Sequence, residues 1–66
     1  GYNSLQANTT GSSNSAFGDS ALYSNTTASN NTAVGYQAGY SNTTGTRVTA
    51  LGYLAGYSTQ SVNAVC

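Results

Sequence analysis

Charged residues are almost absent from this chain of 66 residues, because Asp19 and Arg47 are its only charged side chains. In a typical soluble domain about a quarter of the residues are charged. A chain without a basic surface cannot neutralise phosphates, so we expect no nucleic-acid binding. The apolar runs are too short to cross a bilayer, so we also expect no membrane insertion.

Most residue types that carry enzyme chemistry are missing too. The chain has no histidine, one carboxylate side chain, one arginine and a single cysteine, Cys66. Acid–base catalysis, an activated nucleophile and a metal site each need several such groups together. We therefore expect that the chain is not an enzyme and holds no metal or other cofactor. Cys66 has no partner cysteine within the chain, so we interpret it as structural or incidental, with a disulfide to another chain left open.

Proline is absent as well. Ser, Thr, Asn and Gly dominate the composition, which raises the question of disorder. Disordered polar tracts usually contain proline or many charges, and few aromatic residues. This chain has six regularly spaced tyrosines, which favours a folded structure. Its large apolar side chains are few, so a lone short chain would bury little surface. We therefore expect either stacked copies of one unit or several chains that share a core.

A repeat of seventeen residues organises the sequence. Residues 18–34 match residues 35–51 at nine of seventeen positions, and one glycine per copy keeps the same register. These glycines are Gly1, Gly18, Gly35 and Gly52. The copies are about 1–17, 18–34, 35–51 and 52–66, and together they form one repeat region. Because the chain starts and stops inside the repeat, we expect it to be a fragment of a longer fibre.

The last copy departs from the others. It lacks the Asn-Thr-Thr triplet and has Thr59-Gln60-Ser61 instead. Residues 63–66 resemble residues 32–35 if three residues are deleted, whereas an alignment without a gap pairs Val65 with Val48. The sequence leaves both alignments open.

Within each copy, bulky residues alternate with small or polar ones. The alternation from Ala33 to Ser41, and again from Ala50 to Ser58, is typical of β-strands. No window shows a helical stripe, and each internal glycine would cost a helix about 1 kcal/mol. The runs 24–29 and 41–46 supply Ser, Asn, Thr and small residues suited to turns. Each copy is therefore predicted to form a strand, a turn, a short strand and a second turn.

Seventeen residues suit one coil of a stacked β-structure, whose coils lie about 4.8 Å apart. The predicted fold class is all-β, a repetitive parallel β-solenoid or β-roll with 17-residue coils that assembles as a trimer. Stacking would place equivalent residues over one another. The predicted aromatic ladders are Tyr2, Tyr36 and Tyr53, with Asp19 in the same column, and Tyr23, Tyr40 and Tyr57.

Two further columns follow from the same stacking. Asn8, Asn25 and Asn42 are predicted to form an amide ladder along the axis. The small residues Ala16, Ala33 and Ala50 would leave room for a neighbouring backbone, which suits three chains around one axis.

The segment Asn31-Thr32-Ala33-Val34-Gly35, followed by Ala38, resembles the head repeats of trimeric autotransporter adhesins. Their units run Asn-Ser/Thr-x-Ala-hydrophobic-Gly and continue with an Ala-x-Ala-x-Gly segment. The sequence from Gly35 to Thr44 also resembles repeats in tail-fibre proteins of phages and other viruses. The resemblance implies a trimeric, left-handed parallel β-roll in an extracellular stalk or fibre. This chain departs from the adhesin pattern in its longer unit and in the Tyr-Ser-Asn-Thr-Thr that replaces the second Ala-x-Gly step.

Four asparagines begin acceptor sequences for N-linked glycans, namely Asn8, Asn25, Asn30 and Asn42. The competing explanation is that Asn-Thr-Thr simply supplies good turn and ladder chemistry. Glycans are thus a candidate attachment or partner, beside copies of the chain itself in a homotrimer, an end-to-end filament or both.

These features predict a structural repeat segment of an extracellular fibre, stalk or phage tail fibre that supports surface attachment. Its location would be extracellular, at a cell surface or on a virion. The alternative is a carbohydrate- or ice-binding repeat module that uses the Tyr and Asn-Thr-Thr faces. Against ice binding, neighbouring threonines such as Thr26 and Thr27 cannot both point outward from one flat strand.

Overall fold

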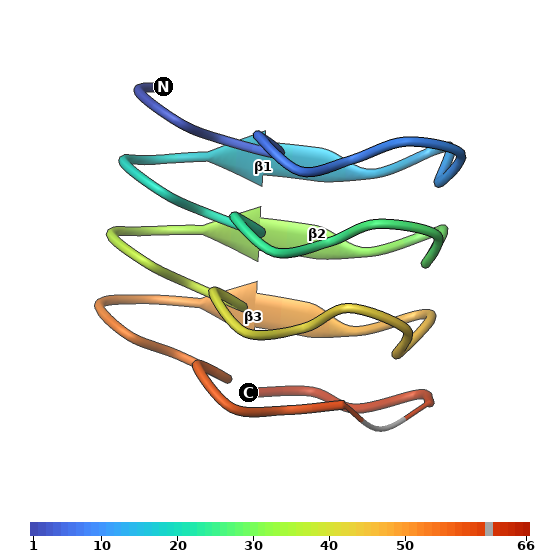
Figure 1. The fold of residues 1–66 in the computed structure, drawn as a ribbon. Coiled ribbons are helices and arrows are strands. Elements are labelled where there is room, and N and C mark those ends of the chain that lie inside the picture. Colours follow the sequence, from blue (N-terminus) through green and yellow to red (C-terminus); the bar gives the residue numbers. More distant parts are fainter. Residues whose placement is uncertain (61) are drawn as a thin grey trace.

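The structure, a computed structural model, describes residues 1–60 and 62–66. Within these residues the chain is all-β, with three strands and no helix, which confirms the predicted class. The strands are β1 (Ser15–Phe17), β2 (Thr32–Val34) and β3 (Thr49–Leu51). They form one open parallel sheet in the order β1-β2-β3 (Figure 1). The described residues include no helix that could span a membrane.

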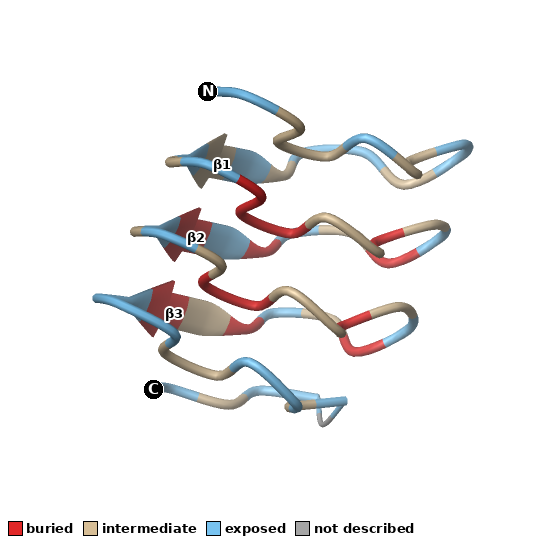
Figure 2. Ribbon diagram, turned by 60° about the vertical axis from the view of Figure 1, so that its left-hand side comes forward, coloured by how far each residue is buried: buried red, intermediate tan, exposed pale blue. Residues whose placement is uncertain are grey.

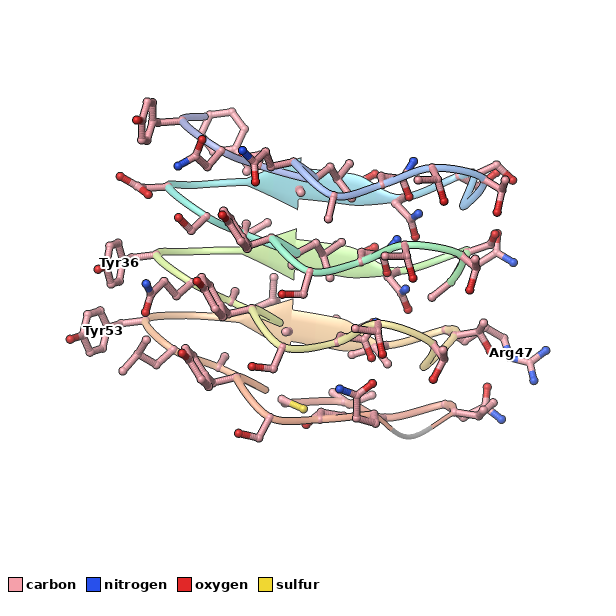
Figure 3. All side chains as sticks on the ribbon, in the orientation of Figure 1. Tyr36, Arg47 and Tyr53 are labelled. Atoms are coloured by element: carbon pink, nitrogen blue, oxygen red, sulfur yellow. The ribbon has the colours of Figure 1, made fainter. Side chains whose placement is uncertain are left out.

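The strand register reproduces the sequence repeat. Ala16 lies opposite Ala33, and Ala33 lies opposite Ala50, so paired residues are seventeen positions apart. Over the described residues, consecutive copies therefore lie side by side (Figure 1). Tyr36 and Tyr53 project from one edge of the stacked copies, and Arg47 projects from the opposite edge (Figure 3).

The predicted strands over 33–41 and 50–58 are wrong over most of their length, because only the strands β2 and β3 at their beginnings are extended. Gln37 and Gly39 have φ angles of 54° and 63°, in the left-handed region. The Ala38 N–H donates to Gly35 O at 3.1 Å, and the Tyr40 N–H donates to Gln37 O at 3.2 Å. Consecutive turns thus replace the strand, and they keep the period of two because every second residue is left-handed.

Backbone hydrogen bonds between copies continue through these turns. The Gly39 N–H donates to Ala55 O at 2.9 Å, and the Gln37 N–H donates to Asp19 O at 2.9 Å. Segment 35–41 is therefore bonded to the copy before it and to the copy after it. The turns satisfy the backbone as a sheet would, although they are not strands.

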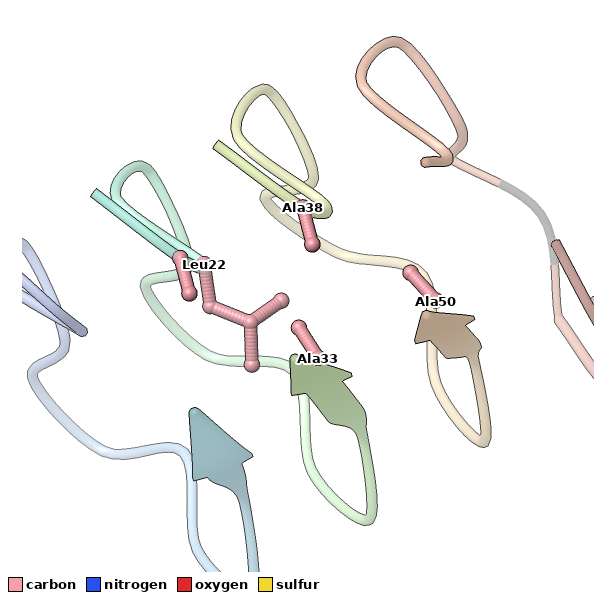
Figure 4. Close-up of a cluster of buried hydrophobic side chains, with 5 residues drawn as sticks. Leu22, Ala33, Ala38 and Ala50 are labelled. Carbon is pink, nitrogen blue, oxygen red and sulfur yellow. The ribbon is translucent and has the colours of Figure 1, made fainter. Parts of the chain in front are cut away.

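A thin core lies between the strands and the turns. Its fully buried residues are Ala21, Leu22, Ala33, Ala38 and Ala50 (Figures 2 and 4). Leu22 is the one large side chain among them, and a Cβ on Gly39 would lie 2.9 Å from its Cδ2. Leucine and glycine thus complement each other at equivalent positions of adjacent copies.

The alanine column does not leave room for a second chain. Ala33 and Ala50 are the middle residues of β2 and β3 and point into the core of their own chain. Ala16, which is partly buried, packs against the same core. The prediction that this column faces a neighbouring chain is wrong, because the alternation along a strand sends the middle residue inward here.

The last copy is one residue short. Val65 pairs with Thr49, an offset of sixteen, so both alignments considered from the sequence are wrong. The left-handed residue of the corner shows the same shift, since it recurs at Ser13, Asn30 and Arg47 and then at Asn63. Tyr57 still stacks on Tyr40 at the regular offset, which places the shortening between Tyr57 and Asn63.

Candidate functional site

A column of amide side chains, formed by Asn8, Asn25 and Asn42, runs along the inside of the structure. The Nδ2 of Asn25 donates to Asn8 Oδ1 at 3.0 Å, and the Nδ2 of Asn42 donates to Asn25 Oδ1 at 3.3 Å. Each of the three Nδ2 groups also donates, at 3.0 Å, to the backbone oxygen three residues further on. Each amide therefore closes the turn of its own copy, and the hydrogen bonds between the amides join the copies.

A second amide position was not identified from the sequence. Asn31 is buried, its Oδ1 accepts the Val48 N–H at 2.8 Å, and its Nδ2 donates to Gly45 O at 3.0 Å. Its own N–H donates to Asn14 Oδ1 at 3.0 Å. The signal was present, because asparagine occupies this repeat position in the first two copies.

The burial of this column bears directly on glycan attachment. Asn25 and Asn42 are 0% exposed, and the Nδ2 of each donates two hydrogen bonds. A glycan on Nδ2 would remove one of these donors and has no space, so attachment at these two residues is incompatible with the fold. Asn8 is half-buried, and Asn30 is the exposed member of the four.

The inner tyrosine ladder consists of Tyr23, Tyr40 and Tyr57. The ring centroids of Tyr23 and Tyr40 are 4.9 Å apart with planes 6° from parallel, and those of Tyr40 and Tyr57 are 5.0 Å apart at 3°. Most faces of these rings are covered by the neighbouring ring. A sugar that stacks on an aromatic ring needs a free face, so this ladder offers little to a carbohydrate, and no pocket is formed among the described residues.

The outer column behaves differently. Tyr36 and Tyr53 stack with centroids 5.6 Å apart and planes 13° from parallel, and their side chains protrude (Figure 3). Tyr2 is 75% exposed, and the next residue of its column is Asp19. The Asp19 Oδ1 accepts the Ser20 hydroxyl at 2.8 Å. The outer column is thus one ring pair, with Tyr2 set apart from it by a carboxylate.

The two threonines of each Asn-Thr-Thr triplet have separate roles. The hydroxyl of Thr9 donates to Thr26 O at 3.2 Å, and that of Thr26 donates to Thr43 O at 3.5 Å. The first threonine therefore contributes to bonding between copies. The second threonines are exposed and form a column of hydroxyls, Thr10, Thr27 and Thr44.

An apolar column, formed by Phe17, Val34 and Leu51, lies on the outer side of the sheet. These side chains are 76%, 42% and 58% exposed. They occupy the last position of β1, β2 and β3, next to the inward alanines. This face could not be found from the sequence once the alanines were expected to point outward. Successive side chains of a strand point to opposite faces, so the residue after each alanine was then expected to point inward.

The described residues contain no cluster of three His, Cys, Asp or Glu side chains, and Cys66 is an exposed free thiol. No protein-family model matches the chain, and no curated protein or solved structure matches it significantly. The amide, aromatic, hydroxyl and apolar columns are therefore the features that bear on its function.

Proposed function

We propose that this chain is a structural repeat segment of an extracellular fibre, stalk or phage tail fibre, in which 17-residue coils stack as a parallel β-solenoid. The observation that carries the proposal is one shared offset. Strand pairing, the amide hydrogen bonds and the tyrosine stacks all join residues seventeen positions apart. Contacts between equivalent residues allow further copies to be added with the same chemistry, each lengthening the rod by about 4.8 Å.

The low charge supports this role. In a stack, a charge at a repeated position would lie about 5 Å from its equivalent in the next copy, and like charges at that distance repel. Asp19 and Arg47 each stand alone in their column, since the neighbours of Asp19 are tyrosines and the equivalents of Arg47 in the adjacent copies, Asn30 and Asn63, are uncharged. A low number of charged residues therefore favours stacking of the copies, whereas a soluble binding domain has no need of so few charges.

Copies of the chain are proposed to associate as a homotrimer through the apolar column. Among the described residues, this column is an exposed apolar feature that recurs in three consecutive copies, on the outward face of the sheet. A stable interface buries about 800 Å² on each partner, which is about a quarter of the 3385 Å² that the chain exposes. The affinity should therefore rise with the number of stacked copies.

Sedimentation velocity over a range of concentrations tests the trimer. The double variant Val34→Lys/Leu51→Lys places charges on the apolar column at positions that are already exposed. The control Thr27→Lys/Thr44→Lys places the same charges, with the same spacing, on the hydroxyl column. We expect the wild type and the control to form trimers and the first variant to stay monomeric. A wild type that is monomeric at every concentration, or a first variant that still assembles, would refute lateral assembly through this column.

A binding module is the second candidate, and one observation favours it. Thr10, Thr27 and Thr44 form a regular column of exposed hydroxyls, as a surface that binds ice or a polysaccharide would need. Ice-growth inhibition and glycan-array binding of the wild type, compared with the Thr27→Val/Thr44→Val variant, separate the two functions. Activity that depends on these threonines would support binding, whereas a fibre segment would show none.

A further inference from the structure

We propose that Tyr36 and Tyr53 form an oxidative cross-linking site, at which hydrogen peroxide and a haem peroxidase join the two rings by a carbon–carbon bond. The two ring centroids are 5.6 Å apart, and the side chains are 46% and 74% exposed. Both phenols are thus open to an oxidant and lie beside each other. The inference goes beyond the fibre role and needs only one chain.

The backbone holds the pair together, and the two side chains are exposed. The Gly52 N–H donates to Val34 O at 2.8 Å, and the Leu54 N–H donates to Tyr36 O at 2.9 Å. These hydrogen bonds flank Tyr53 on both sides and fix its backbone against segment 34–36, which contains Tyr36. Exposed side chains change rotamer within nanoseconds or less, so the ortho carbons of the two rings can meet while a tyrosyl radical persists.

The composition directs oxidation to tyrosine. The chain has no tryptophan, methionine or histidine, and Cys66 is the one thiol that would compete for the oxidant. In the inner ladder Tyr23 and Tyr40 are half-buried, so each stacked pair there, including Tyr40 with the 38% exposed Tyr57, contains a ring that its neighbours restrict. Tyr36 and Tyr53 are the stacked pair whose exposure leaves room for the rings to turn edge to edge.

The reaction is balanced by one molecule of peroxide. Each phenol loses one electron and its hydroxyl proton, which gives two phenoxyl radicals. The radicals couple through their ortho carbons, and the proton on each of these carbons moves to the adjacent oxygen to restore the two phenols. The pair has then lost two hydrogen atoms in all, and hydrogen peroxide takes up the two electrons and two protons to become two molecules of water.

The experiment uses the whole chain with Cys66→Ser, treated with horseradish peroxidase and hydrogen peroxide under native conditions. We expect dityrosine fluorescence and a monomer that has lost the mass of two hydrogen atoms. Arg47 is the single trypsin site, so cleavage separates Tyr36 from Tyr53. The cross-link should therefore keep the two tryptic fragments joined, and tandem mass spectrometry should locate it at these two residues.

Phenylalanine variants identify the reacting phenols. Tyr36→Phe and Tyr53→Phe keep a stacked ring and should each lose the linked fragments. The control Tyr57→Phe removes one phenol of the inner ladder and should retain them, with circular dichroism showing that all variants fold. The proposal is overturned if the link survives Tyr53→Phe, maps to another pair, or forms only between chains. The cross-link is measured in monomeric chains. The result therefore does not depend on whether the chain forms a trimer.

Discussion

The two inner copies of the repeat, residues 18–34 and 35–51, differ from the two outer copies in burial. Every described residue that is buried lies in an inner copy, whereas the described residues of 1–17 and 52–66 are all at least partly exposed (Figure 2). The outer copies carry similar residues, for example Leu5 and Ala55, which pack against the core without being enclosed by it. A copy therefore forms a buried core only when it is flanked on both sides, as expected for a structure stabilised by contacts between neighbours.

The last copy differs further, because it does not continue the amide column. Thr59 stands seventeen residues after Asn42, where another asparagine would donate. The Oδ1 of Asn42 is buried and has no hydrogen-bond partner among the described residues. The last copy makes a different contact beside this position: the Gln60 Oε1 accepts the Thr43 N–H at 3.0 Å, where the equivalent Thr26 N–H donates to the backbone oxygen of Thr43. The comparison shows that each copy supplies an Asn Nδ2 donor to the Asn Oδ1 of the copy before it, and that the last copy lacks this donor.

Replacing Gly35 by alanine should have the largest effect. Its φ is 128°, and a Cβ would lie 2.5 Å from Gly52 O and 2.7 Å from Gly52 C, both backbone atoms. We expect the unfolding free energy to fall by more than about 5 kcal/mol, because strain and a backbone clash add together. Urea denaturation followed by circular dichroism at fixed chain concentration measures the loss.

Gly52→Ala is the matched control in the outer copy. The φ of Gly52 is 118°, but a Cβ there would meet nothing closer than Ala55 Cβ at 4.0 Å. The variant keeps the backbone strain and lacks the clash, so a loss of about 1–3 kcal/mol is expected. Equal losses at the two glycines would show that the close approach of copies does not decide stability.

The second prediction compares Asn25 with Asn8 in the amide column. Asn25→Ala removes two donated hydrogen bonds and two that its Oδ1 accepts, from Asn31 and Asn42. At about 1 kcal/mol for each bond, the expected loss of unfolding free energy is about 4 kcal/mol. Asn8→Ala removes one donated and one accepted bond and should lose about 2 kcal/mol. Thermal and urea unfolding provide the test, and a larger loss at Asn8 than at Asn25 would contradict the ranking of inner above outer copies.

Much of this architecture could be predicted from the sequence because the repeat itself is explicit. The register of the glycines gives the offset of seventeen that the strand pairing has, and the asparagine and inner tyrosine columns follow from it. The ends of the strands could not be predicted from the sequence. In the turns every second residue has a left-handed backbone, so their side chains follow the same period of two as those of a strand. For the same reason the pattern alone did not decide whether Ala33 or Val34 faces outward.

Other features could not be predicted because the same short sequence is compatible with two different structures. Asn25-Thr26-Thr27 is a glycan acceptor sequence and also a buried amide with a turn, and only the burial of Asn25 separates these uses. The Ala64-Val65 pair matches Ala33-Val34 by letter, yet Val65 lies beside Thr49. Three-dimensional packing, which depends on the neighbouring copy, resolves both cases.

The smallest expected effect is a gain, from Thr59→Asn in the last copy. An asparagine there can donate its Nδ2 to the Asn42 Oδ1, which no described residue partners, as Asn42 does to Asn25. Satisfying a buried acceptor should raise the unfolding free energy by about 1 kcal/mol. Thr59→Asp has nearly the same shape but no N–H donor, and its carboxylate would face the Asn42 oxygen, so it should be less stable than the wild type at neutral pH. If both substitutions change the urea midpoint in the same direction, the donor is not what the last copy lacks, and the one-residue shortening accounts for its exposure instead.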